Sequence, residues 1–326
     1  MEAPPRSCIR QPSLMGRLLR FARLPTVFLA VLLALLLPMP LPAEEPPLPT
    51  IGLALGSGGA NGLAHIAMLQ VFDELEIVPD RIVGTSIGAV IGGLYAAGLS
   101  ADEILNIFDD VAGSALDALS GLAGTELGLV DLLQIDLSNG GLLNSGGFMS
   151  FLAGHTEVSR FDELRIPLTV VATDYWTGNS VETDTGQLFP AIEASMAVPG
   201  LFSPVHRDDQ LLIDGGTSNP LPYDLLLDDM DLVIAVDVSG SRHPEPESEP
   251  GITDLLFKTF SIMQQSLIRQ ALAHRRPHLY LKPEAEGVRL LHFNRIHEIL
   301  AQAEPVADEL RDQLTIIMAI QADGMR

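Results

Sequence analysis

Residues 81–97 read RIVGTSIGAVIGGLYAA, a short apolar run followed by a longer run of small and apolar residues. The first part, residues 81–84, predicts a buried strand, and residues 87–97 predict a helix that Gly98 terminates. A strand that leads directly into a helix is the unit from which parallel sheets are built. This stretch therefore indicates an α/β fold.

Short apolar runs and longer helical patterns alternate on both sides of that stretch. They predict further strands at residues 51–55, 168–174, 211–214, 232–238 and 278–282, and helices at residues 62–75, 252–274 and 294–320. Residues 113–147 lack clear periodicity, which predicts a flap or a helical insertion, and residues 239–251 form a polar, Pro-rich loop. The expected architecture is a three-layer α/β fold, in which helices cover both faces of a mostly parallel sheet.

The composition excludes several classes of protein. The chain has 326 residues, 47% of them hydrophobic, and a formal net charge of −23. This content is enough for a large core, and a mean hydropathy of +0.28 argues against disorder. The negative charge argues against nucleic acid as a partner, because binding a polyanion requires a basic surface. A single cysteine excludes a disulfide framework and a cysteine-rich metal site, and we expect neither a cofactor nor a metal.

Residues 1–43 are expected to be a signal peptide rather than part of the fold. Five arginines precede an unbroken apolar run at residues 26–37, and a small-residue cleavage site ends at Ala43. The alternative is an uncleaved membrane anchor, but the run is much shorter than the roughly 20 residues that cross a bilayer. Cleavage after Ala43 predicts a periplasmic or secreted protein, with residues 44–50 as a Pro-rich linker.

The sequence Gly84-Thr85-Ser86-Ile87-Gly88 joins the predicted strand and helix and matches the nucleophile elbow G-x-S-x-G. The flanking glycines, Gly84 and Gly88, prevent clashes in the strained turn, and the serine hydroxyl points outward at the helix N-terminus. There the helix dipole and free amides favour developing negative charge. Ser86 is therefore the candidate nucleophile. The alternative is a Gly/Ser-rich helix start without chemistry.

A glycine-rich loop, GSGGANG at residues 56–62, follows the first predicted strand. A dinucleotide-binding loop would need a glycine where Asn61 stands and an acidic residue at the end of the second strand, so that interpretation fails. A loop of free amides beside a serine elbow instead suits an oxyanion hole. Gly58 and Gly59 are the expected donors, because a carbonyl can approach glycine amides closely, and Gly62 supports the loop. The alternative is a tight turn without chemistry.

The segment Asp214-Gly215-Gly216 ends another apolar run and would be an ordinary turn on its own. Two neighbouring segments give it more weight. The sequence SMAVPGLFSP precedes it at residues 195–204, and NPLP follows it at residues 219–222. It is therefore a third candidate segment of the same chemical site, together with the elbow and the glycine-rich loop.

With these motifs in place, the chain resembles the bacterial patatin-like phospholipases, acyl hydrolases that use a Ser–Asp dyad. The resemblance spans most of residues 51–240, in the order glycine-rich loop, G-x-S-x-G, S-x-A-x-P-x-x-F-x-P and D-G-G. It implies Ser86 as nucleophile, Asp214 as its base and the glycine-rich loop as oxyanion hole, with Gly215 and Gly216 as supporting residues. It also implies a lipid acyl ester as the substrate.

The resemblance further implies that residues 51–238 form the catalytic domain and that residues 239–326 complete it. One position departs from the family pattern, because Asn61 stands where the family usually has Arg or Lys. The backbone N–H remains, but a cation near the oxyanion or a lipid phosphate is lost. The alternative to an acyl hydrolase is therefore a weak or inactive member of the same fold that binds a lipid or a partner.

A Ser-His-Asp triad is the competing catalytic arrangement. His65 lies inside the predicted helix after the glycine-rich loop and is expected to pack or to orient the loop, while His155 and His206 lie in polar contexts. A dyad needs a more basic carboxylate than an ordinary aspartate, whose pKa is about 4. Burial is expected to raise the pKa of Asp214.

Substrate access is expected to be apolar. The Leu- and Gly-rich residues 113–152 predict either a lid over the site or an ordinary core helix; the apolar side chains concerned are Leu129, Leu132, Leu133, Phe148 and Phe151. The negative charge argues against electrostatic docking to anionic lipid. Transient contact with a membrane surface is therefore expected through an apolar patch.

Overall fold

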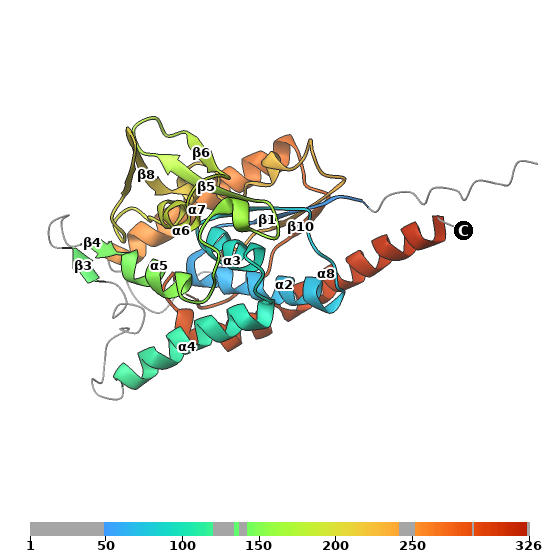
Figure 1. The fold of residues 1–326 in the computed structure, drawn as a ribbon, viewed down its shortest axis with the longest axis horizontal. Coiled ribbons are helices and arrows are strands. Elements are labelled where there is room, and N and C mark those ends of the chain that lie inside the picture. The colour runs from blue at the N-terminus through green and yellow to red at the C-terminus, as the bar shows by residue number, and fades with distance from the viewer. Residues whose placement is uncertain (1–48, 120–133, 137–141, 241–251, 289, 325–326) are drawn as a thin grey trace, which may run out of the picture. The chain divides into compact units, whose positions relative to one another are not determined.

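The computed structural model of the protein describes residues 49–119, 134–136, 142–240, 252–288 and 290–324. The chain from Leu48 to Arg326 forms one compact unit (Figure 1). The expected signal peptide lies outside the described residues, as do Leu129, Leu132 and Leu133 of the expected lid. Among the helices that are described, none is both long and apolar enough to cross a membrane.

A mixed sheet forms the centre of this unit. Strands β10, β9, β1, β2 and β5 run parallel, side by side in that order. Strands β6 and β8 pair with β5 in the antiparallel sense, and β7 pairs with β8. Strands β3 and β4 form a separate two-stranded sheet. The strands are β1 (Ile51–Leu55), β2 (Arg81–Thr85), β3 (Gln134–Asp136), β4 (Leu142–Asn144), β5 (Leu168–Asp174), β6 (Ser180–Thr183), β7 (Val205–Arg207), β8 (Gln210–Asp214), β9 (Leu232–Val236) and β10 (Leu279–Leu281).

Helices cover both faces of the sheet (Figure 1). Helices α2, α3, α4 and α8 contribute to the core on one face. The C-terminal half of α7 contributes to the core on the other face, and its N-terminal half packs against the first. The short helices α5 and α6 pack on each other, and α6 also packs on β5 and β8. The helices are α2 (Ala64–Glu74), α3 (Ile87–Ala96), α4 (Ala101–Leu119), α5 (Gly146–Ala153), α6 (Leu188–Ser195), α7 (Ile252–His274) and α8 (Ile296–Gly324).

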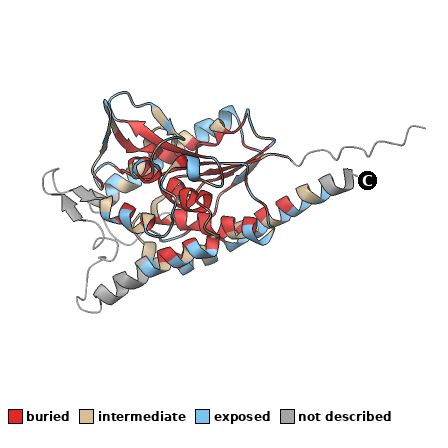
Figure 2. Cartoon of the chain, in the orientation of Figure 1, coloured by how far each residue is buried: buried red, intermediate tan, exposed pale blue. Residues whose placement is uncertain are grey.

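Alternate residues of the central strands supply two separate cores, because successive side chains of a strand point to opposite faces. Leu53 and Leu55 of β1 belong to the larger core, whereas Ala54 between them packs with Val233 of β9 and Ile268 of α7. Every residue of β1 and of β9 is buried, as the colouring of Figure 2 shows. Burial on both faces confirms the predicted three-layer fold with a mostly parallel sheet.

Several parts of the fold differ from the expectations, and they include the unpredicted elements α6, β6 and β7. Helix α4 was not predicted, although Ile104, Ile107 and Phe108 are buried at helical spacing and provide an amphipathic signal. Phe148, one of the residues of the expected lid, is buried in the larger core, and Phe151 packs against that core. These two phenylalanines therefore belong to a core helix, α5, and do not form a lid.

Candidate active site

Ser86 lies in a strained turn between β2 and α3. Its backbone has φ 55° and ψ −122°, a left-handed conformation that is rare for a residue with a side chain. Strain of this kind costs on the order of 1–3 kcal/mol and persists only where the surrounding structure enforces it. The turn places Ser86 directly before the first residue of α3, at the positive end of the helix dipole.

Close approach of the backbone explains the glycines around this turn. A Cβ atom on Gly88 would lie 2.1 Å from the carbonyl oxygen of Leu55, and one on Gly84 would lie 2.7 Å from Cα of Ala89. Neither distance is compatible with a side chain. The elbow therefore packs tightly against the end of β1, from which the glycine-rich loop begins.

The register of the sheet brings Asp214 to the serine. On β5, Val171 pairs with Thr85 of β2, and the next residue, Ala172, pairs with Asp214 of β8. Because β8 is antiparallel to β5, its C-terminal residue meets β5 at the level where β2 ends. The residue after β2 and the last residue of β8 thus lie beside each other, although 128 positions separate them.

Ser86 and Asp214 form a short, buried hydrogen bond. The Ser86 hydroxyl donates to Oδ2 of Asp214 over 2.6 Å, and the Gly216 amide donates to Oδ1 over 2.7 Å. The Asp214 side chain is fully buried. Burial raises the pKa of Asp214 from 3.8 to about 7, and the hydrogen bonds from Ser86 and Gly216 oppose this rise without cancelling it. A carboxylate with this pKa can act as a general base near neutral pH.

Ser195 holds the elbow from the side of β5. Its hydroxyl accepts a 2.8 Å hydrogen bond from the Ser86 amide and donates a 2.5 Å bond to the carbonyl of Val171. The carbonyl of Ala197, two residues further on, accepts a bond from the Asp214 amide over 2.9 Å. The segment that begins at Ser195 therefore positions both members of the Ser86–Asp214 pair.

The amides of Gly58 and Gly59 donate no hydrogen bond to any described residue. Both lie at the start of a short 3₁₀ helix, Gly59–Leu63, where amides have no partner within the helix. A Cβ atom on Gly58 would lie 2.0 Å from the carbonyl oxygen of Val238, so only glycine fits at this position. Gly62 packs against Ile87 of the elbow, where a Cβ atom would meet a side-chain carbon at 2.1 Å. The loop that carries the two free amides thus rests on the elbow.

The two glycines after Asp214 lie against the same structure. A Cβ atom on Gly215 would come within 2.1 Å of the Val171 carbonyl. One on Gly216 would come within 2.1 Å of Nε2 of Gln264. Gln264 belongs to α7 and is buried. Its place beside Gly216 was not expected from the sequence, because no motif marks this helix.

The three histidines weighed for a triad, His65, His155 and His206, make no hydrogen bond to Ser86 in the described part of the chain. His65 is fully buried and its Nε2 donates to the carbonyl of Gly56 over 2.9 Å, while burial lowers its pKa to about 4. It therefore stays neutral and orients the glycine-rich loop, as expected. His155 bonds to its own helix at the carbonyl of Phe151, and His206 is exposed on β7. Within the described part of the chain, Asp214 is the side chain to which the Ser86 hydroxyl bonds.

Asn61 lies close to Gly240, in the segment that follows β9. A Cβ atom on Gly240 would lie 2.9 Å from Nδ2 of Asn61. The buried Oδ1 of Asn61 has no hydrogen-bond partner among the described residues. Across those same residues, no cluster of three or more His, Cys, Asp or Glu side chains has the geometry of a metal site.

The chain is similar in sequence to several known proteins. Residues 53–227 match the family model described as patatin-like phospholipase. An uncharacterized NTE family protein of Mycobacterium tuberculosis is 37% identical over 207 residues, which are 63% of this chain and 54% of the relative. Lysophospholipase NTE1 of Cryptococcus neoformans is 31% identical over 197 residues, 60% of this chain and 12% of that protein.

This chain therefore spans about half the length of the mycobacterial relative. Among solved structures, VipD from Legionella pneumophila is similar with a TM-score of 0.44 and 13% identity, over 82% of this chain and 68% of that chain. The matched residues 53–227 are more than half of the chain and include the glycine-rich loop, the serine elbow and the aspartate. The protein belongs to the patatin-like phospholipase family.

Proposed function

We propose that the protein is a serine acyl hydrolase that cleaves carboxylic esters of lipids through Ser86 and Asp214. The observation that carries the proposal is the 2.6 Å hydrogen bond between the Ser86 hydroxyl and the buried Asp214 carboxylate. Family membership supports the same chemistry. The free amides of Gly58 and Gly59 supply the third component, an oxyanion hole.

The reaction needs only these groups. Asp214 takes the hydroxyl proton as Oγ of Ser86 attacks the acyl carbonyl, and the amides of Gly58 and Gly59 hold the oxyanion. The tetrahedral intermediate expels the alcohol, which receives the proton from Asp214. Water then attacks the acyl-enzyme with Asp214 again as base, releasing the fatty acid and regenerating the serine.

Covalent labelling distinguishes this proposal from a non-catalytic lipid- or partner-binding role. A fluorophosphonate probe reacts with an activated serine, so the purified protein is expected to gain one adduct, on the peptide that contains Ser86. Heat-denatured protein is the control, because the probe requires the folded site. A folded protein that takes up no probe and hydrolyses no lipid ester would support the binding role instead.

The ester hydrolysis rate is expected to rise with pH through neutrality. Only ionised Asp214 accepts the serine proton, and burial raises its pKa to about 7. Values of kcat/KM measured from pH 5 to pH 9 should therefore increase through an apparent pKa near that value and then level off. A profile already flat at pH 5 would show that the base is a carboxylate of ordinary pKa and would contradict the assignment.

Replacing Asn61 is expected to change substrate preference. Asn61→Arg introduces the cation that the family usually has near the oxyanion or a lipid phosphate. One charge-assisted hydrogen bond from it would contribute about 1.5–3 kcal/mol. The Gly240 backbone beside Nδ2 of Asn61 opposes a longer side chain, and overpacking costs on the order of 1–3 kcal/mol. The absolute rate therefore depends on the balance, but the ratio of phospholipid to neutral-ester turnover should rise.

Asn61→Gln is the matched control for that experiment, because it lengthens the side chain without adding a charge. Its phospholipid to neutral-ester ratio is expected to stay at the parental value. If Asn61→Arg folds and also leaves the ratio unchanged, Asn61 is not a determinant of head-group preference.

We further propose that the protein is exported after cleavage near Ala43. The arginine-rich start and the short apolar run support this. N-terminal sequencing of protein recovered from the periplasm or medium tests it. A mature N-terminus near residue 44 is expected, whereas an intact N-terminus in the membrane fraction would indicate the uncleaved anchor.

A further inference from the structure

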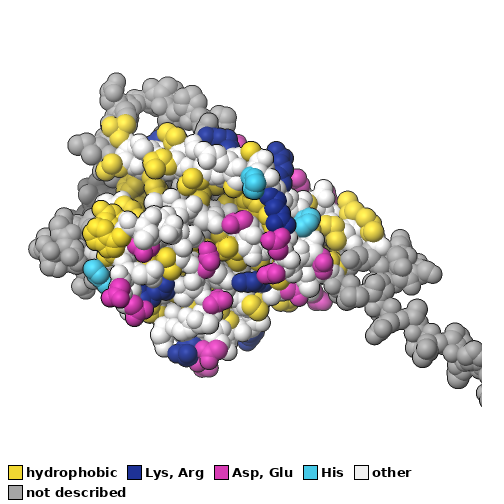
Figure 3. Space-filling model, turned by 90° about the horizontal axis from the view of Figure 1, so that it is seen from above, with side chains coloured by type: hydrophobic (Ala, Val, Ile, Leu, Met, Phe, Trp, Pro, Cys, Tyr) yellow, Lys and Arg dark blue, Asp and Glu magenta, His cyan; other side chains and the backbone are white. Residues whose placement is uncertain are grey.

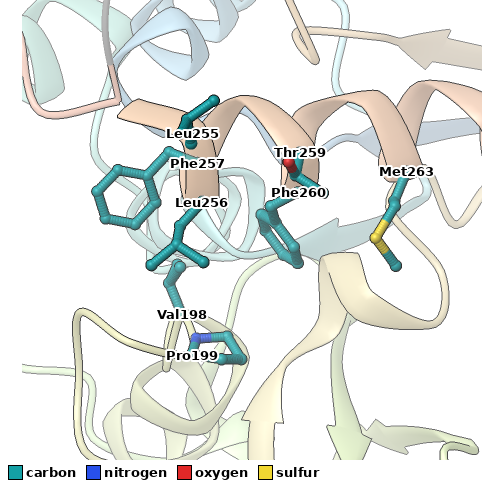
Figure 4. A pocket seen from close by; sticks show the side chains of 8 residues that line it. All are labelled: Val198, Pro199, Leu255, Leu256, Phe257, Thr259, Phe260 and Met263. Carbon is teal, nitrogen blue, oxygen red and sulfur yellow. The ribbon is translucent and has the colours of Figure 1, made fainter. Parts of the chain in front are cut away.

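An apolar pocket lies between α7 and the segment that follows α6. Its volume is about 430 Å³, within the range of roughly 300–1,000 Å³ that is typical of small-molecule sites. The lining side chains carry no charge, and Thr259 contributes the hydroxyl among them; they are Val198, Pro199, Leu255, Leu256, Phe257, Thr259, Phe260 and Met263. In Figure 4 Leu256, Phe260 and Met263 point from α7 toward Val198 and Pro199.

Each wall of this pocket is next in the chain to a residue that contacts Asp214 or its neighbour Gly216. On one side, Val198 follows Ala197, whose carbonyl accepts the hydrogen bond from the Asp214 amide. On the other side, Met263 precedes Gln264, whose Nε2 packs against Gly216 beside Asp214. The pocket therefore begins one residue away from Ala197, which bonds to Asp214, and from Gln264, which lies beside Gly216.

The α7 wall leaves much of its apolar surface open to solvent. Leu256 is 61% exposed and Met263 is 55% exposed. Exposed apolar side chains that gather on one face commonly mark a binding surface. Phe257 and Phe260 are half-buried and pack against the larger core, so they fix the base of the pocket. Figure 3 shows one face of the molecule, on which apolar side chains gather at the upper left.

We infer that this pocket holds the acyl chain of the substrate and that the N-terminal half of α7 sets the chain length that the protein prefers. The inference rests on the proposed function and adds the identity of the acyl subsite. An uncharged, apolar pocket whose walls adjoin Ala197 and Gln264 suits a hydrocarbon chain and offers no partner for the phosphate of a head group. The α7 wall lies beyond residues 53–227, so the part of the chain outside the family match supplies it.

A pair of adjacent substitutions tests the subsite. Met263→Gln places an amide in the pocket, whereas Ile262→Gln makes a comparable change at an exposed residue of α7 that does not line it. The readout is kcat/KM for p-nitrophenyl decanoate divided by kcat/KM for p-nitrophenyl butyrate, with the purified full chain. This ratio should fall roughly tenfold in Met263→Gln, the equivalent of about two buried CH₂ groups. It should stay within twofold of the parental value in Ile262→Gln.

A second variant fills the pocket instead of making it polar. Leu256→Trp adds bulk at a residue that is exposed in the free protein, so the fold should tolerate it. It should lower decanoate turnover while butyrate turnover stays near the parental rate. Equal decanoate to butyrate ratios in the parent, Met263→Gln and Leu256→Trp would overturn the inference while leaving the acyl hydrolase intact. A parent protein that hydrolyses neither ester and takes up no fluorophosphonate would instead overturn the proposed function, which separates the two failures.

Discussion

Ser86→Ala is expected to lower the rate of lipid-ester hydrolysis by a factor on the order of 10⁴ or more, because it removes the proposed nucleophile. Ser86 is 7% exposed and its hydroxyl donates a hydrogen bond to Asp214, so the variant loses that bond but keeps the packing of the turn. Hydrolysis of a short-chain ester and labelling by a fluorophosphonate should disappear together. Circular dichroism and the melting temperature should show that the fold remains.

Ser203→Ala is a suitable control for the loss of a serine hydroxyl. Oγ of Ser203 is buried and has no hydrogen-bond partner among the described residues, so its removal should leave most of the activity. If Ser86→Ala instead hydrolyses the ester at the parental rate, the nucleophile is a different group and the assignment of the elbow is wrong.

The strain at the elbow predicts a further difference between variants at Ser86. Alanine keeps a Cβ atom at φ 55°, whereas glycine adopts that conformation without a steric penalty. The free energy of unfolding should therefore be higher for Ser86→Gly than for Ser86→Ala, although both are inactive. The reverse order would indicate that the entropy of the unfolded glycine chain outweighs the strain.

The parallel half of the fold could be predicted from the sequence because each strand there is buried on both faces. Strands such as Ile51–Leu55 and Leu232–Val236 are continuous apolar runs, and such runs separated by helical patterns indicate crossover connections. The antiparallel strands β6 and β7 have mostly half-buried or exposed residues. Their sequences resemble those of ordinary polar loops, so they gave no comparable signal.

The residues of the dyad could be chosen from their motifs, but their contact could not be derived from the sequence. That contact depends on the pairing of Ala172 with Asp214, one residue beyond the pairing of Val171 with Thr85. Register across three strands is a tertiary property that local patterns do not encode. The contact of Gln264 with Gly216 could not be derived from the sequence either. It depends on how α7, which connects β9 to β10 in the chain, crosses the sheet.

Asp214→Asn is expected to lower ester hydrolysis by roughly a thousandfold, which lies within the usual range for removing a general base. The amide can still accept the Gly216 hydrogen bond, but it cannot take the serine proton.

His65→Gln is the contrasting variant. His65 is neutral and bonds to the Gly56 carbonyl rather than to Ser86, so glutamine can still donate to that carbonyl and most activity should remain. Loss of activity in folded His65→Gln, with activity kept in Asp214→Asn, would favour a histidine base.

Asp214→Asn should also change how the free energy of unfolding depends on pH. In the parent, this free energy is expected to fall as the pH rises, whereas activity is expected to rise. Burial raises the pKa of Asp214 from 3.8 to about 7, so the unfolded chain releases this proton more readily than the folded protein does. The parent therefore loses stability as the pH rises from about 4 to about 7, by roughly 4 kcal/mol in total. Asparagine does not titrate and escapes this loss.

The stability difference between Asp214→Asn and the parent should accordingly be small at pH 4, grow through pH 5 and 6, and level off just above pH 7. Chemical denaturation of both proteins across this range measures it. A difference that does not change with pH would mean that Asp214 ionises in the folded protein as readily as in the unfolded chain. The carboxylate would then lack the basicity that a dyad requires. Agreement would link the two properties physically, because the burial that makes Asp214 an effective base above pH 7 is the same burial that destabilises the fold there.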